Sequence, residues 1–109
     1  MAENGAFFKV VEDGLLALAK QEAGEYASEL VKDVQKFVDE NKDDLLMWGK
    51  QLAAGEMTAE GFNFAVKGRH RLLRMEALTQ AGLATIRVDE LKHKVLETIV
   101  AAATKTFLP

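Results

Sequence analysis

Apolar and small residues recur every three or four positions along almost the whole chain, in two long segments separated by a short break. The first segment, about residues 6–54, carries the repeat through Phe8, Val11, Leu15, Ala19, Ala23, Tyr26, Leu30, Val34, Phe37, Leu45, Trp48 and Leu52. The second, about residues 59–107, carries it through Phe62, Val66, His70, Leu73, Ala77, Ala81, Ala84, Val88, Leu91, Val95, Ile99 and Ala102. A spacing of three and four residues sustained over many turns predicts α-helix in both segments.

The break at residues 55–58 has the chemistry of a turn between two helices. Gly55 suits the C-terminal end of the first helix, and Thr58 suits the N-cap of the second, with Glu60 in its first turn. We therefore predict an all-α fold in which residues 1–109 form a single helical domain, built as a long antiparallel hairpin.

Two positions could interrupt the arms of this hairpin. Asn41 precedes Asp43 and Asp44, which suit the first turn of a new helix, and Gly82 costs about 1 kcal/mol relative to Ala inside a helix. Mild kinks at these positions would preserve the hairpin. True corners there would instead fold the monomer into a compact bundle of four unequal helices, and the sequence leaves this alternative open.

Charge favours pairing of the two arms. Residues 1–60 hold thirteen acidic residues and six lysines, whereas residues 61–109 hold eight basic and four acidic residues. Antiparallel pairing about Met57 places Asp44 beside Arg69 and Asp39 beside Arg74, because helices of equal rise stay in register.

The same register brings the polar interruptions of the two arms, Asn41 and His70, to nearly the same height. We predict that they form a buried hydrogen-bonded pair that fixes the register, as single polar core positions do in coiled coils. The alternative is that both side chains reach solvent at the edge of the apolar stripe.

The second arm carries a further apolar stripe, which lies roughly opposite the first one on a helix. Its members are Phe64, Leu72, Met75, Leu83 and Ile86. A helix that is apolar on two sides needs two neighbours, and a single hairpin supplies one. The sequence thus predicts that this stripe is an oligomer interface, in a homodimer that forms a four-helix bundle, with a tetramer as a further possibility.

Composition excludes several classes of site. The chain is 49% hydrophobic and 28% charged and contains no cysteine, which excludes disulfides, thiolate metal sites and cysteine nucleophiles. No apolar run approaches the roughly 18 residues that a membrane-spanning helix needs, and the N-terminus lacks the basic start of a secretory signal. We expect no transmembrane segment and, by default, a cytoplasmic location.

Two motifs suggest chemistry, and the helical pattern argues against both. Glu90 and His93 have the Glu-x-x-His spacing of carboxylate-bridged di-iron bundles, with Glu97 one turn later, but they point away from the apolar stripe. The basic run 67–74 could contact phosphates, yet the acidic residues of the first arm are placed to neutralise it. We expect no metal, no nucleic acid, no cofactor, no catalytic residues and no enzymatic activity.

Two functions fit this sequence. The first is a small homo-oligomeric helical module for protein–protein interaction or scaffolding, with an unknown protein partner. The alternative is an amphipathic protein that binds a lipid surface or a hydrophobic particle through its apolar termini, where Phe7 and Phe8 at one end and Phe107 and Leu108 at the other could also pack on each other. The acidic polar face of the first arm disfavours anionic membranes.

Overall fold

The computed structural model describes residues 2–108, with side chains from residue 5 onward, and every regular element of that range is helical. The elements are α1 (Ala2–Leu18), a π-helical turn η1 (Ala19–Ala23), a 3-10 turn η2 (Gly24–Tyr26), α2 (Ala27–Glu40), α3 (Lys42–Ala53), α4 (Ala59–Lys67), η3 (His70–Leu72), α5 (Glu76–Gln80) and α6 (Thr85–Phe107). The predicted all-α class is confirmed. Met1 and Pro109 of the predicted domain lie outside the described residues.

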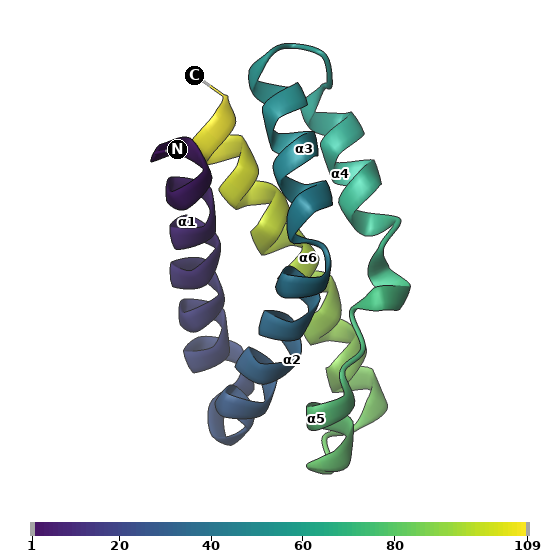
Figure 1. Ribbon diagram of the computed structural model, residues 1–109. Coiled ribbons are helices and arrows are strands. Elements are labelled where there is room, and N and C mark those ends of the chain that lie inside the picture. Colours follow the sequence, from purple (N-terminus) through teal and green to yellow (C-terminus); the bar gives the residue numbers. More distant parts are fainter. Residues whose placement is uncertain (1, 109) are drawn as a thin grey trace.

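The chain reverses direction at three glycines. Gly24, Gly55 and Gly82 have φ angles of 54°, 76° and 95°, and they are the residues with positive φ within 2–108. Only glycine adopts such angles without a steric penalty from Cβ. Figure 1 shows the result: α1 runs down, α2 and α3 run up, α4 to α5 run down, and α6 runs up again, so that both ends of the chain lie at the same end of the molecule.

This path corrects the predicted two-armed hairpin. The first arm is not one helix over residues 6–54, because α1 ends at Leu18 and the chain turns back through η1 and η2. The second arm also divides, since α5 ends at Gln80 and α6 begins at Thr85 on the far side of Gly82. The compact monomeric arrangement that the sequence left open is closer to the structure, with its first corner at Gly24 instead of Asn41.

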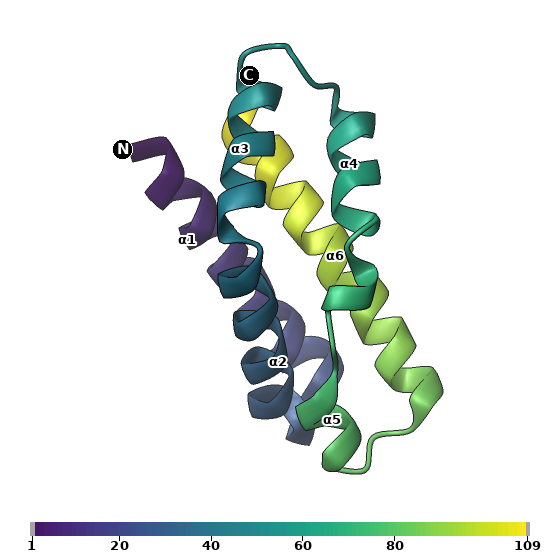
Figure 2. The same cartoon turned by 45° about the vertical axis from the view of Figure 1, so that its right-hand side comes forward.

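The predicted turn at residues 55–58 is present, with the expected cap. The hydroxyl of Thr58 accepts a hydrogen bond from the Gly61 amide at 3.0 Å, and Gly55 supplies the positive φ after α3. Asn41 marks only a junction, because its amide donates to Phe37 O and its carbonyl accepts from Leu45 N. Helical hydrogen bonds therefore run past Asn41, and α3 continues in the direction of α2 (Figure 2).

One core joins the helices. Its largest fully buried side chains are Phe7, Phe37, Phe62, Leu30, Leu45, Leu52, Leu73, Leu78, Ile99, Val34, Val66 and Val95. Helix α6 lies along α1 and also contacts α3 and α4. Close approach of α3 to α6 requires Gly49, since a Cβ built there would lie 2.5 Å from a ring atom of Phe107. The rings of Phe7 and Phe107 are 5.3 Å apart, so the two ends pack on each other, which is one of the possibilities that the sequence left open.

Polar contacts attach the irregular segments to this core. The carboxylate of Asp33 in α2 accepts hydrogen bonds from the backbone amides of Ala77 and Leu78, at 2.9 and 3.1 Å, and so caps the short helix α5 from another element. Glu22, in the π-helical turn η1, is held by two residues of α6. Lys94 pairs with its side-chain carboxylate at 3.0 Å, and Arg87 donates a hydrogen bond to its backbone carbonyl at 2.9 Å. These contacts hold the first reversal against α6.

Candidate binding groove

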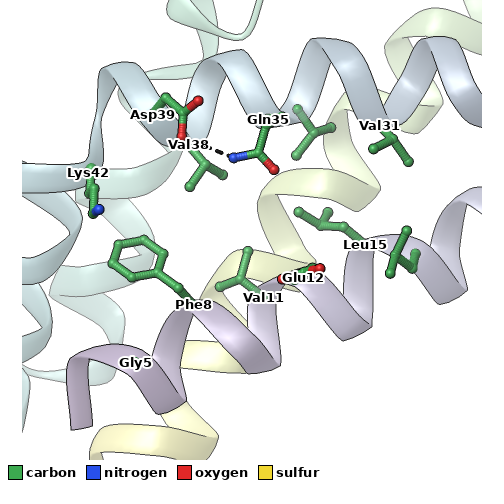
Figure 3. Close-up of a pocket in the computed structure, with 12 residues that line it drawn as sticks. Gly5, Phe8, Val11, Glu12, Leu15, Val31, Gln35, Val38, Asp39 and Lys42 are labelled. Atoms are coloured by element: carbon green, nitrogen blue, oxygen red, sulfur yellow. Dashed lines mark hydrogen bonds between the residues drawn. The ribbon is translucent and has the colours of Figure 1, made fainter. Parts of the chain in front are cut away.

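A groove runs along the surface between α1 and α2. Its first wall consists of Gly5, Phe8, Val11, Glu12, Leu15 and Leu16. Its second wall consists of Val31, Val34, Gln35, Val38 and Asp39 of α2, with Lys42 at the start of α3. Figure 3 shows Gly5 and Phe8 at the same end as Lys42, and Leu15 at the same end as Val31. The walls are therefore antiparallel, as the reversal at Gly24 requires.

The groove is about three helical turns long, and its depth is apolar. Each wall covers three helical turns, which is roughly 16 Å at 1.5 Å per residue. The volume is about 370 Å³. Val11, Leu15, Val34 and Val38 are buried and form the floor, whereas Glu12, Leu16, Gln35, Asp39 and Lys42 are exposed along the rims. The hollow is thus apolar at depth and open to solvent along its length.

Polar groups sit only at the rims of this groove. The amide of Gln35 donates to Asp39 at 3.0 Å, one turn further along α2 (Figure 3). The ammonium of Lys42 lies 5.6 Å from the ring centroid of Phe8, a cation–π distance. The lining contains no hydroxyl, imidazole or thiol group. Its chemistry is that of a surface that binds apolar groups, with two carboxylates and one ammonium to orient what is bound.

Sequence reasoning placed Phe8, Val11, Leu15 and Val34 on a core stripe but missed the groove. The missed residues are Leu16, Val31 and Val38, each the second member of an apolar doublet whose first member is buried. Such doublets widen the apolar face of a helix beyond what a single contact covers. They are the signal from which this surface could have been found.

The stripe predicted as an oligomer interface is not continuous in the structure. Met75 is buried in the core of the chain itself and Leu83 is half-buried, whereas Phe64 and Ile86 are 82% and 69% exposed. Leu72, at the end of η3, is 37% exposed. The prediction assumed one continuous helix, but α4 ends at Lys67, so the helical spacing that would align these residues is lost.

The predicted pair of Asn41 and His70 does not form. Asn41 is buried as expected, but its side-chain amide donates to Phe37 O at 2.9 Å within its own helix segment. His70 is exposed, and its Nδ1 lies 2.9 Å from Lys67 O. Each side chain is satisfied locally, because the break after α4 turns His70 away from the α2–α3 segment.

The basic run and the metal-like spacing also find local partners. Arg69 pairs with Asp44 at 2.9 Å, which confirms the predicted register next to the turn, and its guanidinium lies 5.2 Å from the ring centroid of Trp48. His93 pairs with Glu97 at 2.8 Å. Within the described part of the chain, no three His, Cys, Asp or Glu residues are grouped so that they could hold a metal ion.

Comparisons of the chain with protein-family models, with curated proteins and with solved structures found no match. Among residues 2–108, no helix combines the length and the apolar character needed to cross a bilayer. The groove between α1 and α2 is therefore the feature from which a function can be inferred.

Proposed function

We propose that the protein is a helical protein–protein interaction module whose α1–α2 groove receives the apolar face of a partner helix. The observation that carries this proposal is the match between the groove and a helix: walls about three turns long, an apolar floor between them and charged residues along the rims. A partner helix with apolar residues at positions i, i+3 or i+4, and i+7 would present its anchors at the spacing of the floor.

Burial of the exposed apolar side chains of the groove would contribute favourable free energy to this binding. Leu16 is 45% exposed, and Phe8 and Val31 are half-buried. Full burial of a large apolar side chain is worth about 1.5–3 kcal/mol, so covering the remaining surface of Leu16 contributes about 1 kcal/mol. The carboxylates of Glu12 and Asp39 favour a partner with basic residues beside its apolar face.

Binding to a lipid surface is the second candidate, and the structure supports it less well. That function would use the apolar ends of the chain, but Phe7 and Phe107 are buried against each other. Exposing them to an interface would break the contact that joins α1 to α6. The groove, by contrast, can bind without any rearrangement of the core.

A selection from a library of displayed helical peptides tests the proposal. Leu16→Glu places a charge in the groove, and Met47→Glu places the same charge on α3 at a residue of similar exposure, 49%. We expect the selected peptides to carry the apolar spacing above, to bind the wild-type protein and Met47→Glu alike, and to bind Leu16→Glu at least tenfold more weakly. Circular dichroism confirms that both variants are folded. Selected peptides that bind both variants equally, or a selection that enriches none, would contradict the proposal.

A further inference from the structure

Helix α4 carries an aromatic side chain that its own fold leaves uncovered. Phe64 is 82% exposed, the highest value among the large apolar side chains of the described residues. One turn before it, Met57 Cγ lies 3.3 Å from the position that a Cβ of Gly61 would occupy, so Met57 covers this bare position. One turn after it, Gly68 is exposed and has no side chain. Positions 61, 64 and 68 therefore form an apolar strip with the i, i+3, i+7 spacing of the proposed partner helix.

Opposite charges flank Phe64 along the same face of α4. Glu60 lies four residues before it and Lys67 three residues after it, which places all three side chains on one side of the helix. Neither charge forms an ion pair with another residue in the described part of the chain. Lys67 lines a hollow beside α6 in which two lysines, Lys67 and Lys92, stand against one aspartate, Asp89. The face is thus acidic at the N-terminal end of α4 and basic at its C-terminal end.

The groove presents the reverse order of charge. Figure 3 shows Lys42 at the same end of the groove as Gly5, with its ammonium 5.6 Å from the ring centroid of Phe8. Glu12 follows Phe8 by four residues and Gly5 by seven, so it lies one to two helical turns further along. Asp39 on the opposite wall lies between these two levels and adds a second negative charge. The groove is thus positive at one end and negative further along, at about the separation of the two charges on α4.

We propose that the helix received by the groove is α4 of a second copy of this chain. Phe64 packs on the apolar floor of the groove. Glu60 lies at the end that holds Lys42. Lys67 faces the carboxylate of Glu12. The nine residues of α4 span roughly 14 Å at 1.5 Å per residue, which fits within a groove of roughly 16 Å. This inference rests on the proposed function and identifies its partner.

This contact joins two different surfaces, so it links copies head to tail. Helices α1 and α4 stand on opposite sides of the molecule, with α3 and α6 between them (Figures 1 and 2). A copy whose groove is filled therefore still presents its own α4, and a copy whose α4 is bound still has an open groove. Such a heterologous contact builds a ring where the rotation closes and an open chain where it does not.

Mixing two variants tests this arrangement by sedimentation velocity on the full chain. Wild-type protein should form larger species as its concentration rises. Phe64→Glu removes the aromatic anchor and Leu16→Glu places a charge in the groove, so each variant should self-associate about tenfold more weakly, or weaker still. Each variant keeps the surface that the other has lost, so an equimolar mixture should form a 1:1 complex and nothing larger. Ile86→Glu, at a 69% exposed residue of α6, is the control and should assemble like the wild type.

Charge reversal tests the polarity of the contact. Glu12→Lys and Lys67→Glu should each weaken assembly by about three- to tenfold, because each replaces an attractive pair with a repulsive one at an exposed site. A single chain that carries both changes should recover the wild-type dissociation constant to within about twofold. Glu90→Lys, at an exposed residue of α6, makes the same change in charge as Glu12→Lys and should have no effect. Circular dichroism confirms that each variant is folded.

The results separate this inference from the function on which it rests. A wild-type chain that remains monomeric at millimolar concentration would overturn the assembly. A mixture of Phe64→Glu and Leu16→Glu that stays monomeric would also overturn it, and so would a double charge reversal that fails to recover. Phe64→Glu leaves the groove intact, so helical peptides should still be selected on this variant. Peptides selected there, with a wild type that never assembles, would leave the proposed function standing while this inference fails.

Discussion

The buried carboxylate of Asp33 should be among the most important polar groups for stability. It is 6% exposed and accepts two backbone hydrogen bonds from the first turn of α5, a helix too short to stabilise itself. Asp33→Ala removes both acceptors. It leaves the buried Leu78 amide unsatisfied, while water can reach the half-buried Ala77 amide.

The size of this effect follows from those two amides. A buried donor without a partner costs about 1–3 kcal/mol, and one that water can reach costs less, so we expect Asp33→Ala to lower the free energy of unfolding by about 2–3 kcal/mol. The alanine variant also avoids the cost of removing the Asp33 carboxylate from water on folding. The net loss therefore stays below the full strength of two charge-assisted hydrogen bonds. For a domain of this size, that is a fall in Tm of roughly 10–20 °C.

Urea denaturation followed by circular dichroism measures this difference. Asp13→Ala is the matched control, because Asp13 is exposed and its partner among the described residues is Lys9 at 3.3 Å, a surface pair worth at most about 0.5 kcal/mol. Hydrogen exchange should also accelerate at the amides of Ala77 and Leu78 before the rest of the core in Asp33→Ala. If the two alanine variants unfold within 0.5 kcal/mol of each other by this assay, Asp33 does not stabilise α5 as argued.

Two further predictions concern packing and the turn. Gly49→Ala should lower the free energy of unfolding by about 1–3 kcal/mol, because its Cβ would meet the Phe107 ring at 2.5 Å; Gly5→Ala, where the space is open, is the control in a thermal melt. A double-mutant cycle of Asp44→Ala and Arg69→Ala should give a coupling of at most about 1 kcal/mol that falls with added salt, because both side chains of this 2.9 Å pair are more than one-third exposed. A larger coupling that salt does not change would show that the pair is more desolvated than the structure indicates.

Local rules predicted the parts of this fold that local chemistry determines. The helical class follows from the apolar spacing, and the turn at residues 55–58 follows from Gly55 and Thr58. The pairing of Asp44 with Arg69 follows from that turn, since register is most certain within a few residues of a reversal. Each of these predictions depended on residues that are close in the sequence, or on residues whose relative positions are set by the turn at residues 55–58.

The reversal at Gly24 could not be found in the same way. Ala19, Ala23 and Leu30 are all buried, so the apolar spacing continues across the turn without interruption. The spacing of apolar residues along the chain indicates which residues face the core, but it does not indicate the direction of the chain. Here a π-helical turn followed by a 3-10 turn keeps the apolar spacing while the direction of the chain changes. The predicted pair of Asn41 and His70 was wrong because it assumed a straight second arm, whereas α4 ends at Lys67 and His70 begins a 3-10 turn.

The apolar doublets explain both how the core closes and why one edge of it stays open. The first members, such as Leu15 and Leu30, meet the core, while Leu16 and Val31 stand about 100° further round their helices. Helix α6 covers α1 on its inner side, and α5 lies beside α2 away from the groove. No described segment is left to cover the outer edge that α1 and α2 share. The buried floor of the groove therefore closes against the core from below and faces solvent from above, which is the surface that the proposed partner helix would cover.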